Sequence, residues 1–376
     1  MLYTTTMKSS MKSSFFHWSY GHILKPVFFR QDPETVHDRM VGVGKRLGEH
    51  KLTRKVTRSL FAYRDSMLEQ TVLGIKFKNP IGLAAGFDKN AELLNVLPSV
   101  GFGFAEVGSI TGYPCAGNDK PRLWRLPKSK SLVVYYGLKN DGAEAIAQRL
   151  QNRKFGNVVG TSVAMTNCQA NLDIETAIKD YVKAFNAFVQ IGDYFTINIS
   201  CPNAEGGQPF VDHEKLDKLL RAIDPIETKK PVFIKLSPDL AITEIDHILN
   251  VVGRHRIHGI ICTNLTKPRS NPKIVDDHVP ENGGMSGKVV QELSDKLLAY
   301  IYKKTKGQYV LVGCGGVFNA EDAYKKIRLG ASLVQLATGM IFEGPQLIGD
   351  INRGLVELLK RDGFKNISEA IGVDNK

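Results

Sequence analysis

The chain has 376 residues, 43% of them hydrophobic, enough for one large domain of roughly 250–300 residues and a smaller module. Its net charge is +12, but the Lys and Arg residues are dispersed and no nucleic-acid-binding motif occurs, so we expect no nucleic-acid partner. The five cysteines form no CxxC pair and no zinc-ligand spacing appears, which disfavours a disulfide framework and a metal site.

Residues 1–31 contain no Asp or Glu and are rich in Ser and Thr. This composition is typical of an organelle targeting segment, although such segments usually favour Arg over the Lys found here. We expect residues 1–16 to form a leader that directs the protein to mitochondria, and a disordered polar leader is the alternative. No run reaches about 18 apolar residues, so we expect no transmembrane helix.

Residues 17–65 are predicted to form a helical module. Asp32-Pro33-Glu34 indicates a helix start, because Asp caps the free N–H groups and Pro fits the first turn. Apolar residues then recur at helical spacing at Val36, Met40, Val43 and Leu47. The apolar side chains of this module have two interpretations: ordinary packing onto the main body, or insertion into a bilayer surface or around an apolar ligand.

From about residue 70, strand-like runs alternate with helical ones. Eight such strands predict a (β/α)8 TIM barrel over residues 66–376. A doubly wound sheet is the alternative, but the GxGxxG turn that usually marks it is absent. The predicted strands cover residues 80–85, 104–110, 157–163, 195–200, 232–236, 259–263, 309–313 and 333–337.

Glycine-rich segments follow the last two predicted strands, at residues 313–316 (GCGG) and at Thr338-Gly339. Glycine lets backbone N–H groups approach an anion closely, and the loops after strands seven and eight commonly hold phosphate in such barrels. Residues 283–287 (GGMSG) are expected to be a third glycine-rich loop. Together these segments predict a ligand that carries a phosphate.

Polar side chains stand at other strand ends. Lys235 lies in an apolar strand and needs an anionic partner, for which a reduced flavin is suitable. Lys89 follows the first strand and is expected to pair with a substrate carboxylate or with Asp88. Three amides, which offer both donors and acceptors, suit a planar heterocycle: Asn198, Asn203 and Asn264.

Cys201, in the run SCPN after a buried strand, is the candidate general base. Removing a proton from a carbon beside a carbonyl needs a positioned base, and a flavin can take the accompanying hydride. A thiol can serve where its site favours the thiolate. Cys168, Cys262 and Cys314 are expected to be inert and buried.

These motifs make the chain, over roughly residues 30–372, resemble the dihydroorotate dehydrogenases. The matching runs include NPIGLAAGFDKN, INISCPN, VFIKLSPDL, GGMSG and GASLVQLATGMIFEGP. The layout resembles the class 2, quinone-linked branch, whose N-terminal helices form a ubiquinone tunnel. The resemblance implies an FMN barrel that oxidises dihydroorotate to orotate, located in eukaryotes at the inner mitochondrial membrane.

The resemblance also implies roles for individual residues. Cys201 would be the base. The substrate contacts would be Lys89, Gly137, Asn203 and Asn264. The FMN contacts would be Ala84, Ala85, Gly86, Ser109, Asn198, Lys235, Thr263, Gly287, Gly315, Gly316, Thr338 and Gly339.

The chain departs from the family pattern at several of these places. Class 2 members normally carry Ser as the base, whereas Cys belongs to class 1. Val134 replaces an Asn that holds the pyrimidine, Ser162 replaces another amide, and Ala337 stands where Tyr is common. With the two changed amides, the bulky pair Tyr135-Tyr136 indicates a reshaped pocket. Three interpretations follow: an active dihydroorotate dehydrogenase with an unusual pocket, an FMN oxidoreductase for another substrate, or a structural subunit of a mitochondrial membrane complex.

Overall fold

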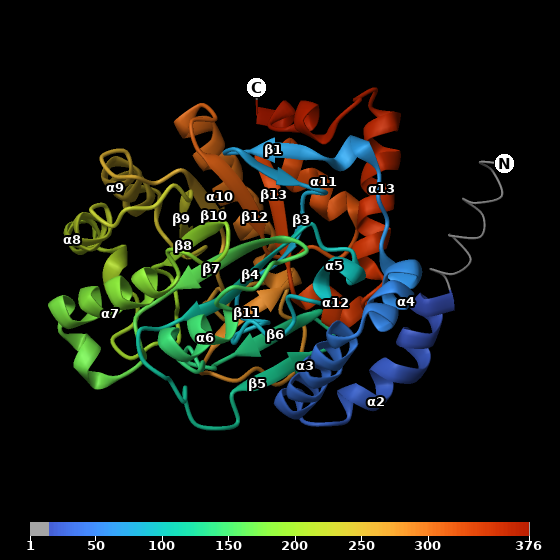
Figure 1. The fold of residues 1–376 in the computed structure, drawn as a ribbon, viewed down its shortest axis with the longest axis horizontal. Helices are drawn as coiled ribbons and strands as arrows, with labels where there is room; N and C mark the ends of the chain where they lie inside the picture. Colours follow the sequence, from blue (N-terminus) through green and yellow to red (C-terminus); the bar gives the residue numbers. More distant parts are fainter. Residues whose placement is uncertain (1–14, 376) are drawn as a thin grey trace.

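The computed structural model describes residues 15–375, and the predicted leader at residues 1–16 therefore lies almost entirely outside the described residues. Eight parallel strands close into a barrel, as predicted, and each overlaps its predicted segment. The predicted (β/α)8 fold is thus confirmed (Figure 1). In barrel order the strands are β3 (Ile81–Leu83), β4 (Phe104–Ile110), β7 (Val158–Val163), β8 (Tyr194–Asn198), β9 (Val232–Leu236), β10 (Gly259–Cys262), β12 (Val310–Cys314) and β13 (Ala331–Leu336).

Helices cover the barrel because each presents an apolar face to the strands. Their buried residues form one continuous hydrophobic layer with the outward side chains of the strands. The helices are α5 (Leu97–Val100), α6 (Ala143–Leu150), α7 (Ile174–Ala187), α8 (His213–Ile223), α9 (Ile242–Val252), α10 (Gln291–Thr305), α11 (Ala320–Arg328), α12 (Thr338–Glu343) and α13 (Leu347–Arg361).

Aromatic side chains fill the amino-terminal end of the barrel. Phe104, at the start of β4, packs edge-on against Phe77 and lies close to Tyr194, which in turn contacts Phe233. Phe77 belongs to a hairpin that the sequence did not predict, formed by β1 (Gln70–Val72) and β2 (Ile75–Phe77). Because this end is filled, a ligand has access only from the carboxyl ends of the strands.

A three-stranded antiparallel sheet, which was also not predicted, lies beside the carboxyl end of the barrel. It consists of β5 (Leu123–Leu126), β6 (Ser131–Val134) and β11 (Gly284–Gly287). Most of the segment expected to be a third glycine-rich loop is therefore strand β11, paired with β6. The expectation of a loop was wrong, because the alternation of apolar and polar residues that marks a strand is hard to recognise in a run of small residues.

The N-terminal module (residues 17–65) is helical, as predicted, and its blue helices pack at one end of the barrel (Figure 1). It contains a short π-helical turn (Tyr20–Leu24), α2 (Lys25–Phe29), α3 (Pro33–Glu49) and α4 (Lys51–Phe61). The Asp32 carboxylate caps α3 by accepting the N–H of Thr35 at 2.8 Å. Of the predicted apolar stripe on α3, Val36 is buried, but Met40, Val43 and Leu47 are exposed. Among residues 15–375, no helix is both long and apolar enough to cross a bilayer.

Candidate active site at the carboxyl end of the barrel

A cavity of about 210 Å³ opens at the carboxyl ends of the barrel strands. Every residue predicted to touch cofactor or substrate lines it. Most of them are there because parallel strands bring their carboxyl ends together, whereas Gly137 comes from the loop that follows β6 and Gly287 from the three-stranded sheet. The lining also includes His37 of α3 and apolar side chains such as Leu123, Leu132 and Ile341. The cavity thus runs from the polar strand ends to the N-terminal module.

The amides and hydroxyls of the strand ends bind one another. Asn198, the last residue of β8, donates to the Ser109 hydroxyl at 2.8 Å and accepts from Asn264 at 3.1 Å. Asn264 also donates to Ser200 at 3.0 Å. These bonds fix the side chains before any ligand arrives, which is the preorganisation that a binding site needs.

Ser162, one of the departures from the family pattern, lies behind this network. It is fully buried, is absent from the cavity lining, and its hydroxyl lies 2.8 Å from that of Ser109. The change at this position therefore reaches the cavity only through Ser109.

Lys235 provides a test of whether FMN fits. Its side chain is 4% exposed and lines the cavity, yet within residues 15–375 no carboxylate forms an ion pair with it. A buried ammonium without a counter-charge is costly, so the site calls for an anionic group. Gly316, in the cavity lining, can only be a glycine, because a φ of +72° and a Cβ 2.3 Å from Gln291 would both exclude a side chain. A glycine backbone at this place lets an anion approach the N–H groups closely. The residues present therefore fit a flavin that carries a phosphate.

Cys201 lines the cavity and is partly exposed. Burial raises the pKa of its thiol to about 11, although the backbone N–H groups of Asn203 and Ala204 act in the opposite direction. The free protein therefore holds a neutral thiol at this place. Cys262 and Cys314 are buried as expected, whereas Cys168 is exposed and its predicted burial was wrong.

Among residues 15–375, Lys89 forms no ion pair with Asp88, one of its two expected partners, and the other, a substrate carboxylate, stays a prediction. Its ammonium lies 3.3 Å from His37 Nε2 and 3.9 Å from the ring centre of Tyr136. Asp88 instead accepts the backbone N–H groups of Glu92 and Leu93, each at 2.8 Å. Burial lowers the pKa of Lys89 to about 8. Burial, reinforced by the charge of Lys89, lowers the pKa of His37 to about 3, so His37 is a neutral acceptor.

Asn203 has a free acceptor beside the cavity. Its Nδ2 donates to the Val134 carbonyl at 2.8 Å, while its buried Oδ1 has no hydrogen-bond partner among the described residues. An unpaired buried acceptor costs free energy and invites an N–H donor from a ligand. Val134 itself lines the cavity with an apolar side chain, so it offers no side-chain amide to a ligand. Its backbone carbonyl is already occupied by the Asn203 side chain.

Sequence reasoning did not identify His37 and Lys139 as residues of the cavity, whereas Tyr136, of the pair expected to reshape the pocket, does line it. His37 belongs to a helix far from the barrel strands in sequence, and no motif marks it. Lys139 follows Gly137 in a segment that departs from the family pattern, and no chemical role was assigned to it. The one signal available was that this segment flanks Gly137, a predicted substrate contact.

Known proteins of one family match the chain over most of its length. The sequence pattern of the family described as dihydroorotate dehydrogenase matches residues 67–359. A dihydroorotate dehydrogenase (quinone) of Gloeobacter violaceus is 38% identical over 351 residues, 93% of this chain and 98% of the relative. The one from Natronomonas pharaonis is 39% identical over 355 residues, 94% of this chain and 98% of the relative.

A solved structure shares the fold as well as the sequence. The crystal structure of the Eimeria tenella dihydroorotate dehydrogenase in complex with ferulenol superposes with a TM-score of 0.81 at 29% identity. It covers 92% of this chain and 96% of the other. These likenesses favour neither a different substrate nor a purely structural role. With its barrel, its cavity and its relatives in agreement, the chain belongs to the dihydroorotate dehydrogenase family, whose cofactor is FMN.

Proposed function

We propose that the protein oxidises dihydroorotate to orotate in pyrimidine biosynthesis and passes the electrons to a quinone. The observation that carries this proposal is the buried, unpaired ammonium of Lys235 in the same cavity as Cys201 and the free acceptor of Asn203. This combination offers a counter-charge for a flavin, a base, and a partner for a ring N–H.

In this proposal FMN, when bound, would supply the acceptor for the hydride that leaves the substrate. Ala84, Ala85, Gly86, Ser109, Asn198, Lys235, Thr263, Gly287, Gly315, Gly316, Thr338 and Gly339 hold it. The Lys89 ammonium binds the substrate carboxylate, and Asn203 and Asn264 bind the pyrimidine ring, with Gly137 beside them. Each role is consistent with the chemistry of the residue and with its position in the cavity lining.

Cys201 removes the proton from the ring carbon beside the carbonyl, while the hydride leaves from the neighbouring carbon. The proton is held on the Cys201 sulfur until solvent takes it. The thiol must first lose its own proton, which its high pKa opposes. Catalysis near neutral pH therefore depends on a small thiolate population.

The apolar end of the cavity supports a quinone as the acceptor. Leu123, Leu132 and Ile341 line it, next to His37 on α3 of the N-terminal module. This module also carries a large share of the exposed apolar side chains. On α4 these are Leu52, Val56 and Leu60, spaced four residues apart on one face. We therefore propose that the module attaches peripherally to a membrane surface, where quinones dissolve.

Anaerobic mixing with dihydroorotate tests the proposal. The flavin absorbance of the purified holoenzyme should bleach, and a quinone should then restore it. If the flavin of the holoenzyme does not bleach with dihydroorotate, the proposed reaction is wrong.

Three points stay predictions. They are the division of the chain into a helical module (residues 17–65) and a barrel (residues 66–376), a mitochondrial location, and membership of a larger membrane complex. Expression with a fluorescent tag, with and without residues 1–16, tests the location. The mass of the native particle in mild detergent tests the complex.

A further inference from the structure

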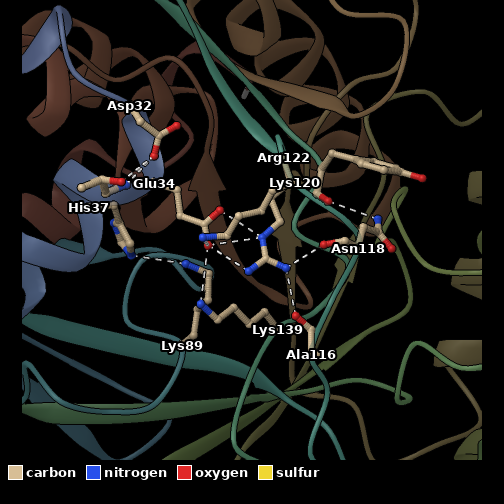
Figure 2. Close-up of polar contacts among 11 residues, drawn as sticks. Asp32, Glu34, His37, Lys89, Ala116, Asn118, Lys120, Arg122 and Lys139 are labelled. Carbon is tan, nitrogen blue, oxygen red and sulfur yellow. Dashed lines mark hydrogen bonds and ion pairs between the residues drawn. The ribbon is translucent and has the colours of Figure 1, made fainter.

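One of the contacts that join the N-terminal module to the rest of the chain is a buried carboxylate. Glu34, on the first turn of α3, is 3% exposed and accepts from Arg122 Nη2 at 2.8 Å and Nε at 3.1 Å. Lys120 and Lys139 each lie 3.5 Å from the same carboxylate (Figure 2). Burial acts to raise the pKa of Glu34, but the hydrogen bonds and charge of Arg122 outweigh it and lower that pKa to about 2. The carboxylate is therefore ionised at every pH at which the protein works.

Arg122 uses its other terminal nitrogen on the loop that precedes β5. Its Nη1 donates to the carbonyls of Ala116 at 2.9 Å and Asn118 at 2.7 Å (Figure 2). A guanidinium presents its donors in a rigid fork, so fixing one side by Glu34 fixes the direction of the other. The position of the Asn118 backbone therefore depends on a helix of the N-terminal module.

The Asn118 side chain carries this constraint to the substrate end of the cavity. Its Nδ2 donates to the carbonyls of Tyr135 and Asn203, each at 3.1 Å, and its Oδ1 accepts from Asn167 at 2.8 Å. Asn203 is the residue whose unpaired Oδ1 awaits a ring N–H. The packing is tight, because a Cβ on Gly137 would lie 2.5 Å from Asn118 Oδ1. A displacement of Asn118 is therefore transmitted to Asn203 and not absorbed by free space.

We propose that Glu34 is a positioning residue for the substrate: through Arg122 and Asn118 it holds Asn203 in the orientation that binds the pyrimidine ring. The inference rests on the proposed function. The N-terminal module would then have two roles. Helix α3 lines the apolar end of the cavity, where a quinone is proposed to bind, and through Glu34 it also sets the affinity for the substrate. His37, one turn along the same helix, contacts Lys89 and is a second link between α3 and the substrate end of the cavity.

Glu34→Gln is the test, because it keeps the shape of the side chain and removes the charge that orients Arg122. In the reductive half-reaction without quinone, the dihydroorotate concentration for half-maximal bleaching should rise about tenfold, while the limiting rate changes less than twofold. In steady-state turnover with quinone present, the KM for quinone should also change less than twofold. The loss should be absent in an Arg122→Met background, because the path is then already broken. Glu34→Asp should recover part of the affinity.

Lys45→Gln is the matched control. It breaks the 2.9 Å ion pair between the half-exposed side chains of Lys45 and Glu92, which also joins α3 to the barrel. Among residues 15–375, neither of these side chains bonds a residue of the cavity lining. This variant should bind dihydroorotate as the wild type does. Equal effects of the two variants, or a Glu34→Gln effect confined to quinone, would overturn the inference and leave only a docking role for Glu34.

Hydrogen–deuterium exchange of the ligand-free protein gives a readout that does not depend on turnover. Glu34→Gln should increase exchange at residues 116–122 and at residues 201–206, whereas Lys45→Gln should change neither segment. Unchanged exchange at residues 201–206 contradicts the proposed path even if the wild-type flavin is not bleached by dihydroorotate. If Glu34→Gln does not fold, Asn118→Ala removes the same path within the barrel and should weaken dihydroorotate binding similarly.

Discussion

The pH dependence of dihydroorotate oxidation follows from two cavity side chains whose pKa values lie in an unusual order. Lys89 must be charged to bind the substrate carboxylate, and burial lowers its pKa to about 8. Cys201 must be ionised to remove a proton, and burial raises its pKa to about 11. Between these two values most molecules carry neither the ammonium nor the thiolate, so the active form is always a minor species.

The magnitude follows from the two values. At pH 7 roughly one Cys201 thiol in ten thousand is ionised, and this fraction grows tenfold with each pH unit. Lys89 is half charged at about pH 8, so kcat/KM should rise about fiftyfold from pH 6 to pH 8. Above pH 8 the loss of the Lys89 charge cancels the gain in thiolate, and kcat/KM should stay level up to about pH 11.

Anaerobic stopped-flow bleaching of the flavin at low dihydroorotate concentration measures this profile. In Lys89→Arg the guanidinium does not titrate, so the rise should continue beyond pH 8. Independently, alkylation of Cys201 by iodoacetamide in a Cys168→Ser background should accelerate tenfold per pH unit up to pH 10. A plateau below pH 7 in both measurements would show that the thiolate is already formed and would refute this reasoning.

Three further changes have defined outcomes. Val134→Asn should restore a donor at the substrate end and lower the Kd for orotate about tenfold, measured from the flavin spectrum, because one satisfied polar group is worth ~1–3 kcal/mol; unchanged affinity would contradict a direct role for this position. Lys235→Met should lower the flavin midpoint potential in a redox titration, since the buried ammonium stabilises the reduced, anionic form, whereas Lys235→Arg should retain most of the potential. Leu52→Ser, Val56→Ser and Leu60→Ser combined should abolish flotation with liposomes and leave bleaching by dihydroorotate intact, because exposed side chains contribute little to folding stability; bound protein in the float fraction would reject α4 as the attachment surface.

The barrel and most of its site could be predicted from local sequence. Runs such as residues 232–236 (VFIKL) and 259–262 (GIIC) are short and apolar, and this length and composition favour buried strands over helices. Once eight such strands close, the residues at their carboxyl ends must meet, and this is why Cys201, Lys235 and Asn264 share one cavity. Their types alone then indicate a base, a counter-charge and a ring partner.

Other features depend on contacts between distant segments, and local patterns do not report them. Glu34 at the start of α3 has the sequence environment of an ordinary helix terminus, where a carboxylate is favourable in itself. Only packing against the loop before β5 buries it on Arg122 and connects it to Asn203. Sequence determined which groups this protein has for chemistry; the tertiary structure decided their ionisation and their partners, because desolvation and hydrogen bonding arise only when the chain has folded.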